Sequence, residues 1–165
     1  MNKPLYEMFE SGASDEEILA SIAAGANVEE RKPITAEDNP MVTPLQIAVK
    51  QRRSEVIIRA LLEAGADIEA SWCDENDMID AGLEWDDFID HFEYRDWYAP
   101  QTPLCIALFN KDLAMIKLLG ELGADADAEY TIDYGQTIRE IAQNSIEEEG
   151  ADELDRKVWQ AIKKI

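Results

Sequence analysis

One stretch of the sequence, residues 43–67, reads TPLQIAVKQRRSEVIIRALLEAGAD. A second stretch, residues 102–125, reads TPLCIALFNKDLAMIKLLGELGAD. Both open with Thr-Pro-Leu and close with Gly-Ala-Asp, and the spacing from threonine to closing glycine is 22 residues in the first and 21 in the second. Self-similarity on this scale indicates a repeat architecture, so internal repeats organise the chain.

Each copy carries the signals of a pair of helices. Thr43 and Thr102 are preferred N-cap residues, and the proline that follows each of them suits the first helical turn. Gly65 and Gly123 supply the left-handed residue that ends the second helix of the pair. Because a single pair cannot bury its apolar face alone, the pairs are expected to stack. That face is predicted from apolar residues at helical spacing, Leu45, Ala48 and Val49 in the first helix and Val56, Ile57, Ala60 and Leu61 in the second.

A weaker copy precedes these two. Residues 3–5 read KPL and begin 22 residues before Gly25, which opens a Gly-Ala-Asn run similar to the Gly-Ala-Asp turn. Helices are therefore expected near residues 4–11 and 15–24, as an N-terminal capping unit whose outer side meets water.

Another weak copy follows, beginning with residues 135–142, which read GQTIREIA. An amphipathic last helix is predicted over about 151–164. Its apolar face consists of Leu154, Val158, Trp159 and Ile162.

These residues resemble the ankyrin repeat, whose signature is Thr-Pro-Leu-His-x-Ala followed by a Leu-Leu-x-x-Gly-Ala-Asp-like run. The resemblance is clearest over residues 43–70 and 102–127. The family's histidine, which ties neighbouring repeats by hydrogen bonds, is replaced by Gln46 and Cys105. The resemblance implies an all-α ankyrin-repeat solenoid of about four helix–turn–helix repeats.

A chain of 165 residues is expected to form one domain. The single ankyrin-repeat domain, residues 1–165, is divided into an N-terminal capping repeat (1–30), repeat two (43–70), an insertion (71–100), repeat three (102–127) and a C-terminal capping repeat (135–165).

The insertion breaks the period of the repeats. In an uninterrupted array about 12 residues separate each turn glycine from the next threonine, whereas Gly65 and Thr102 are 37 residues apart. Residues 71–100 hold ten acids, one base, seven of the thirteen aromatic residues and the only histidine. Helical spacing of apolar residues predicts a short amphipathic helix over about 82–94. Insertions in solenoids often emerge on the binding face.

The net charge of −21 excludes several classes of partner. Nucleic-acid binding requires clustered Lys and Arg, and an anionic membrane surface repels a negative protein. The first residues lack the apolar core of a secretory signal, so we expect a cytoplasmic protein with Cys73 and Cys105 as free thiols. The negative field favours a basic protein partner.

Catalysis, cofactors and metals have little support in the sequence. Residues 74–79 lack the glycine and the fifth ligand of an EF-hand loop, and one cysteine and one histidine in the insertion do not make a zinc site. The sequence has no phosphate-binding glycine loop, nucleophile elbow or zinc-protease motif. We therefore interpret the chain as non-enzymatic and without a cofactor.

The function predicted from these features is a protein–protein interaction module that is monomeric when free. By analogy with ankyrin scaffolds in bacterial toxin–immunity pairs, it is interpreted as an acidic inhibitor or immunity protein that occludes a toxin or effector. Alternative functions are a general adaptor, a nucleic-acid mimic that sequesters a DNA-binding protein, and a divalent-ion sensor. An alternative interpretation of the insertion is that its aromatic residues only pack locally and bind no partner. Candidate partner-binding residues are Trp72, Asp74, Asp77, Trp85, Asp86, Asp87, Asp90, His91, Tyr94 and Trp97.

Overall fold

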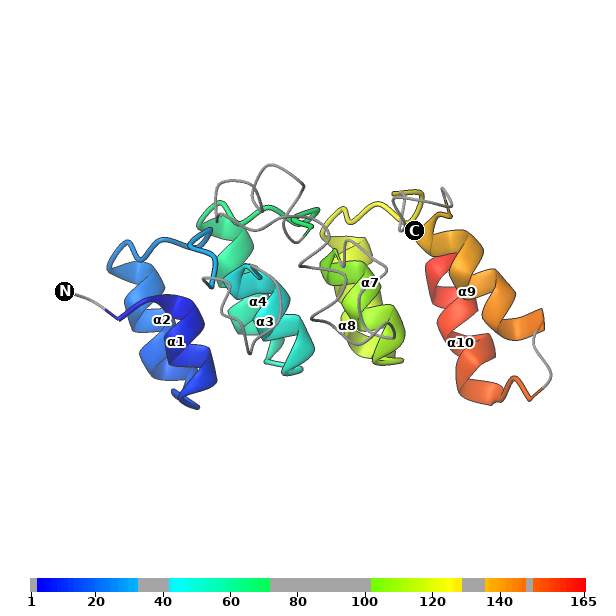
Figure 1. Cartoon of the computed structure of the whole chain (residues 1–165), viewed down its shortest axis with the longest axis horizontal. Helices are drawn as coiled ribbons and strands as arrows, with labels where there is room; N and C mark the ends of the chain where they lie inside the picture. Colours follow the sequence, from blue (N-terminus) through cyan, green and yellow to red (C-terminus); the bar gives the residue numbers. More distant parts are fainter. Residues whose placement is uncertain (1–2, 33–41, 72–101, 129–135, 148–149) are drawn as a thin grey trace, which may run out of the picture.

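The computed structural model describes residues 3–32, 42–71, 102–128, 136–147 and 150–165. Within these ranges the chain forms eight α-helices and no β-strand (Figure 1). The helices are α1 (Leu5–Glu10), α2 (Asp15–Ala23), α3 (Pro44–Lys50), α4 (Glu55–Glu63), α7 (Pro103–Phe109), α8 (Leu113–Glu121), α9 (Ile138–Glu147) and α10 (Glu153–Ile162).

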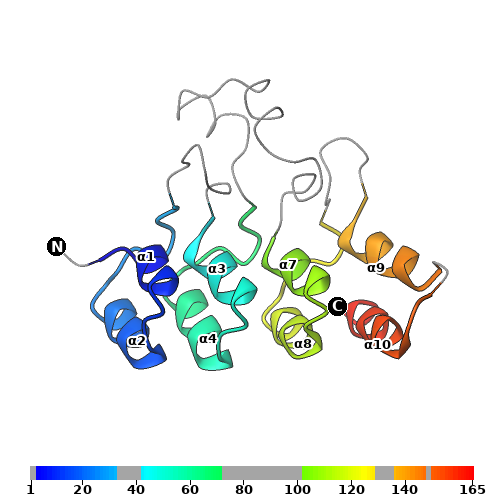
Figure 2. The same ribbon diagram turned by 60° about the horizontal axis from the view of Figure 1, so that its bottom comes forward.

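The helices are arranged as four antiparallel pairs in a row (Figure 2). One layer contains α1, α3, α7 and α9, in which each helix contacts the next. The other layer contains α2, α4, α8 and α10, in which α2 contacts α4 and α8 contacts α10. This confirms the all-α stack of helix pairs expected from the sequence.

The predicted helix starts are confirmed at both Thr-Pro-Leu sites. Thr43 Oγ1 accepts the Gln46 backbone N–H, and Thr102 Oγ1 accepts that of Cys105, each at 3.3 Å. The proline after each threonine occupies the first turn, where its missing N–H leaves no helical hydrogen bond unmade. The glycine stops are confirmed as well, because Gly65 and Gly123 have φ of 100° and 97°.

The Gln46 side chain forms hydrogen bonds that connect two segments of the second repeat. Its side-chain oxygen accepts the Thr43 backbone N–H at 2.7 Å, and its amide nitrogen donates to the Ala70 carbonyl at 3.0 Å. Gln46 is 1% exposed, so these bonds satisfy polar groups that water does not reach. The replacement of the family histidine therefore leaves a side chain here that still joins the helix start to the segment after α4.

The apolar core confirms most of the expected faces, with one correction in α4 and another in α10, where Leu154 is 39% exposed. Leu45, Ala48 and Val49 are fully buried, whereas Val56 is 59% exposed and Ile58 takes its place in the core. Successive residues of a helix are 100° apart, and α4 buries the face formed by Ile57, Ile58 and Leu61. Val56 points away from that face. Three consecutive apolar residues do not reveal which two of them face inward.

A candidate partner-binding edge

The turns that follow α2, α4 and α8 lie along one edge of the stack (Figure 1) and share one local structure. In each, a side-chain oxygen accepts the backbone N–H of the residue two positions later, at 2.8–3.0 Å. Such Asx turns fix the chain reversal without help from a neighbour. We call these three turns, residues 27–29, 67–69 and 125–127, the turn ladder. The bonded pairs are Asn27 with Glu29, Asp67 with Glu69, and Asp125 with Asp127.

Glutamate side chains join consecutive turns of the ladder. Glu29 Oε1 accepts the Asp67 backbone N–H at 2.9 Å, and Glu69 Oε1 accepts the Asp125 backbone N–H at 2.8 Å. A carboxylate that accepts a backbone N–H makes a charge-assisted hydrogen bond. In the first two turns, the second residue after the Asx position therefore bonds to the next turn.

The ladder ends on an ion pair instead of a further turn. Asp127 accepts two hydrogen bonds from Arg139, at 2.7 Å from Nε and 3.0 Å from Nη2. The same guanidinium donates to the Ile162 carbonyl at 3.2 Å. The hydrogen bond from Arg139 lowers the pKa of the Asp127 carboxyl. Arg139 thus connects the last turn to both helices of the fourth pair.

Glu69 has the most unusual environment in the ladder. Burial raises the pKa of its carboxyl, the Asp125 N–H opposes that rise, and the charges of Asp125 and Asp67 add to it. Its Oε2 atom is buried and has no hydrogen-bond partner among the described residues. The negative charge of Glu69 is consequently disfavoured in the folded protein.

The ladder gives its edge of the stack a negative charge. It carries the carboxylates of Glu29, Asp67, Glu69, Asp125 and Asp127, of which only that of Asp127 forms an ion pair between described residues. The edge also holds the start of the insertion, because Arg31 Nη1 donates to the Ser71 carbonyl at 2.8 Å. Ser71, the first residue of the insertion, follows the second turn, and Thr102, the first described residue after the insertion, caps α7.

All ten predicted partner-binding residues lie in residues 72–97, outside the described residues. The expected amphipathic helix over about 82–94 and Cys73 also lie outside the described residues. Sequence reasoning missed Glu29 and Glu69 as ladder residues. The signal was present, because an Asn or Asp followed two positions later by an acid recurs just after Gly25, Gly65 and Gly123.

The described residues offer few reactive groups. Cys105 is fully buried, and burial raises the pKa of its thiol well above the ordinary value. A buried neutral thiol is a poor nucleophile and behaves as a small apolar residue.

Within the described ranges no three His, Cys, Asp or Glu side chains are grouped to hold a metal ion. None of the helices in those ranges is long and apolar enough to cross a membrane.

No curated protein matches this sequence. Residues 42–72 match the family model described as Ankyrin repeat. This range contains α3, α4 and the second turn of the ladder. The chain therefore carries an ankyrin repeat, and its all-helical stack of helix pairs is consistent with an ankyrin-repeat protein.

Proposed function

We propose that this chain is an inhibitor or immunity-type protein that binds a basic protein partner and occludes its working surface. An ankyrin repeat is typical of non-enzymatic protein–protein interaction modules, and this supports the binding role. The sign of the partner's charge is inferred from the net charge of −21 and from its distribution. As part of the same proposal, the protein is a cytoplasmic monomer, and its repeats have the boundaries given in the sequence analysis.

The observation that carries the proposal is the acidic turn ladder, after whose second turn the acidic insertion follows in the sequence. The turn ladder is negative along its length, and Ser71, from which the insertion starts, lies just beyond its second turn. The insertion itself holds ten acids and one base. A partner that presents Lys and Arg would meet negative charge from both, which speeds encounter and fixes orientation.

The insertion would supply the binding energy as well as the charge. Trp72, Trp85 and Trp97 would act as anchors, because an indole buries a large area while freezing few torsions. Carboxylates of the insertion would pair with basic side chains around those anchors. The proposed charge partners are Asp86, Asp87 and Asp90, with Asp74, Asp77, His91 and Tyr94 beside them.

A matched pair of double variants tests the proposal. The partner is first captured from the source cells with the full chain, identified, and prepared for calorimetric titration. Asp86→Asn with Asp87→Asn is expected to weaken binding by about tenfold or more, as for paired charges at an interface. Glu16→Gln with Glu63→Gln makes the same charge change on the exposed faces of α2 and α4 and is expected to leave affinity unchanged.

Deleting residues 74–98 separates this function from a general adaptor. If the insertion is the recognition element, binding is lost, whereas an adaptor that binds through its repeats keeps its partner. The substitutions above decide the matter if the deletion impairs folding. Recovery of only acidic partners, or of none, would refute the proposal. Competition by duplex DNA for the captured partner would indicate nucleic-acid mimicry in its place.

A further inference from the structure

The layer formed by α2, α4, α8 and α10 contains a groove that differs in charge from the rest of the molecule. It lies between α8 and α10 and has a volume of about 890 Å³. Four basic residues line it, Lys117, Arg156, Lys157 and Lys164, against two acids, Glu121 and Glu153. The whole chain has 36 acids and 15 bases, so an excess of cations at one place runs against the composition.

Three of the four cations of this groove have no ion pair with another described residue. Elsewhere in the described residues, bases such as Lys32, Arg53 and Lys111 form ion pairs at 2.6–3.2 Å. Among the described residues, Lys117, Arg156 and Lys164 form no ion pair. In a protein so rich in carboxylates, unpaired cations gathered along one groove remain available to an outside anion.

The two acids of the groove offset only part of its positive charge. Glu121 lies 3.9 Å from Arg59 of α4, and Glu153 lies 2.7 Å from Lys157 one turn along α10. Each acid is therefore already next to a base. The four bases of the lining still outnumber its two acids, so the groove has a net positive charge.

Apolar residues also line the groove. Leu113 and Gly120 contribute from α8, and Ala161 and Ile165 from α10 and the residues after it. A Cβ atom on Gly120 would lie 2.6 Å from Ile165 Cγ1, so the missing side chain gives Ile165 its place against α8. The position equivalent to Gly120 in α4, three residues before the turn glycine, is Leu62.

The dimensions of the groove match a short helix. The lining residues of α8 run from Leu113 to Glu121, and at 1.5 Å per residue this is about 12 Å, or two to three helical turns. Two adjacent helices present a groove into which a third helix can pack its apolar stripe. Cations on both rims would face acids that flank such a stripe.

We propose that the groove between α8 and α10 binds an acidic amphipathic helix of a second partner protein. This site is separate from the proposed recognition of a basic partner by the insertion, and neither depends on the other. A short helix fits better than a nucleic acid, because a long polyanion would extend beyond the groove onto a chain of net charge −21.

A designed peptide tests the proposal on the full-length chain. The probe is a fluorescein-labelled 14-residue peptide with leucines at positions i, i+3, i+4 and i+7, glutamates at the positions that flank this stripe and alanines elsewhere, which favour the helix. Its binding is measured by fluorescence anisotropy. Binding is expected to weaken as salt is raised. Lys117→Glu with Arg156→Glu is expected to weaken it by about tenfold, since each exposed charge contributes modestly.

The matched control is Lys3→Glu with Lys50→Glu, two exposed lysines outside the groove whose reversal changes net charge by the same amount. It is expected to leave peptide affinity unchanged. Thermal melting checks that both double variants are folded. Amide shifts in α8 and α10 on adding the peptide support the assignment of the site.

Several results would overturn the proposal. They are an absence of binding, equal binding of a peptide with lysines in place of the glutamates, and equal weakening in the control variant. Self-association that the groove variant abolishes would assign the groove to a second copy of the chain. Equally tight binding of a 14-nucleotide single-stranded DNA would show a site for any polyanion.

Discussion

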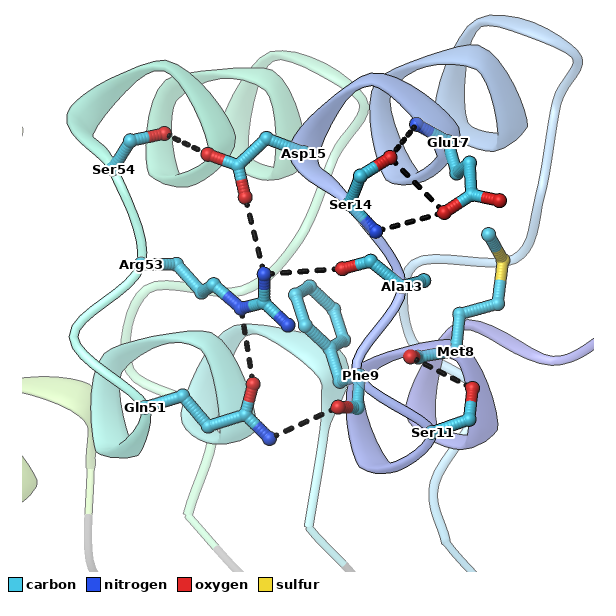
Figure 3. A network of polar contacts seen from close by, with 10 residues as sticks. All are labelled: Met8, Phe9, Ser11, Ala13, Ser14, Asp15, Glu17, Gln51, Arg53 and Ser54. Atoms are coloured by element: carbon cyan, nitrogen blue, oxygen red, sulfur yellow. Dashed lines mark hydrogen bonds and ion pairs between the residues drawn. The ribbon is translucent and has the colours of Figure 1, made fainter.

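The guanidinium of Arg53 lies over the ring of Phe9, 5.5 Å from its centroid, and joins the first helix pair to the second (Figure 3). Its Nη1 donates to the Ala13 carbonyl at 3.1 Å and to Asp15 at 3.2 Å. Gln51 supports the arrangement, because its side-chain oxygen accepts from Arg53 and its amide nitrogen donates to the Phe9 carbonyl. One side chain thus contacts α1, α2 and the loop between them.

Replacing Arg53 is therefore expected to weaken the attachment of the first pair. Arg53→Ala should lower the free energy of unfolding by about 2 kcal/mol, because it removes hydrogen bonds to the Ala13 carbonyl and to Gln51, one ion pair and one cation–π contact. Urea unfolding followed by circular dichroism measures the change. Arg53→Lys should lose less, because it keeps the charge but not the planar fork.

Arg59→Ala is the control for that measurement. Arg59 is 40% exposed and pairs with Glu55 within α4, so its loss should change stability by less than about 0.5 kcal/mol. Equal destabilisation by the two alanine variants would contradict the role given to Arg53.

Gln46 offers a second test, at the start of α3. Gln46→Ala leaves the Thr43 N–H and the Ala70 carbonyl without their side-chain partner in a buried place, which should cost about 2–4 kcal/mol. Gln46→His, the residue that the ankyrin signature carries there, should retain most of the stability because imidazole can accept and donate at once. Urea denaturation compares the two. A histidine variant as unstable as the alanine variant would refute this account.

Much of the repeat scaffold could be predicted from the sequence because its signals are local. Thr43 caps the helix that begins one residue later, and Gly65 ends a helix through its own backbone conformation. The error at Val56 also has a local cause, because three apolar residues in succession fit more than one helical face.

The ladder could not be predicted in the same way. The bond from Asp125 to Glu69 joins residues 56 positions apart, and its formation depends on how the second and third pairs stack. The groove between α8 and α10 likewise requires Ile165 to fold back onto Gly120. The ten partner-binding residues of the insertion remain predictions, since their part of the chain lies outside the described residues.

Gly65 provides a test of backbone conformation. It has a φ of 100°, and nothing lies within 4 Å of where a Cβ would be, so any cost of a side chain there comes from the backbone. Gly65→Ala should lower stability by about 1–2 kcal/mol, and Gly65→Asn by less, because Asn tolerates positive φ better. The measurement is the urea midpoint at constant slope. Equal stability of the alanine variant and the unmodified chain would contradict the assignment.

Glu69 allows a prediction of how stability depends on pH. Its pKa in the folded protein is raised, chiefly by burial, so the folded state holds this proton at pH values where the unfolded chain has lost it. The ionised group therefore penalises folding at neutral pH. The penalty falls as pH is lowered through the folded-state pKa and is gone below the ordinary value of 4.5.

Glu69→Gln removes the charge but keeps an oxygen to accept the Asp125 N–H. It also removes repulsion from Asp67 and Asp125. The variant should be more stable than the unmodified chain at pH 7, and the difference should shrink towards pH 4.5. Urea unfolding of both proteins across this range isolates the contribution of Glu69, because every other titrating group is shared. Glu69→Ala, which loses the hydrogen bond as well, should be less stable than Glu69→Gln at every pH. A glutamine variant that is destabilised by the same amount at both ends of the range would mean that the ladder requires the negative charge itself.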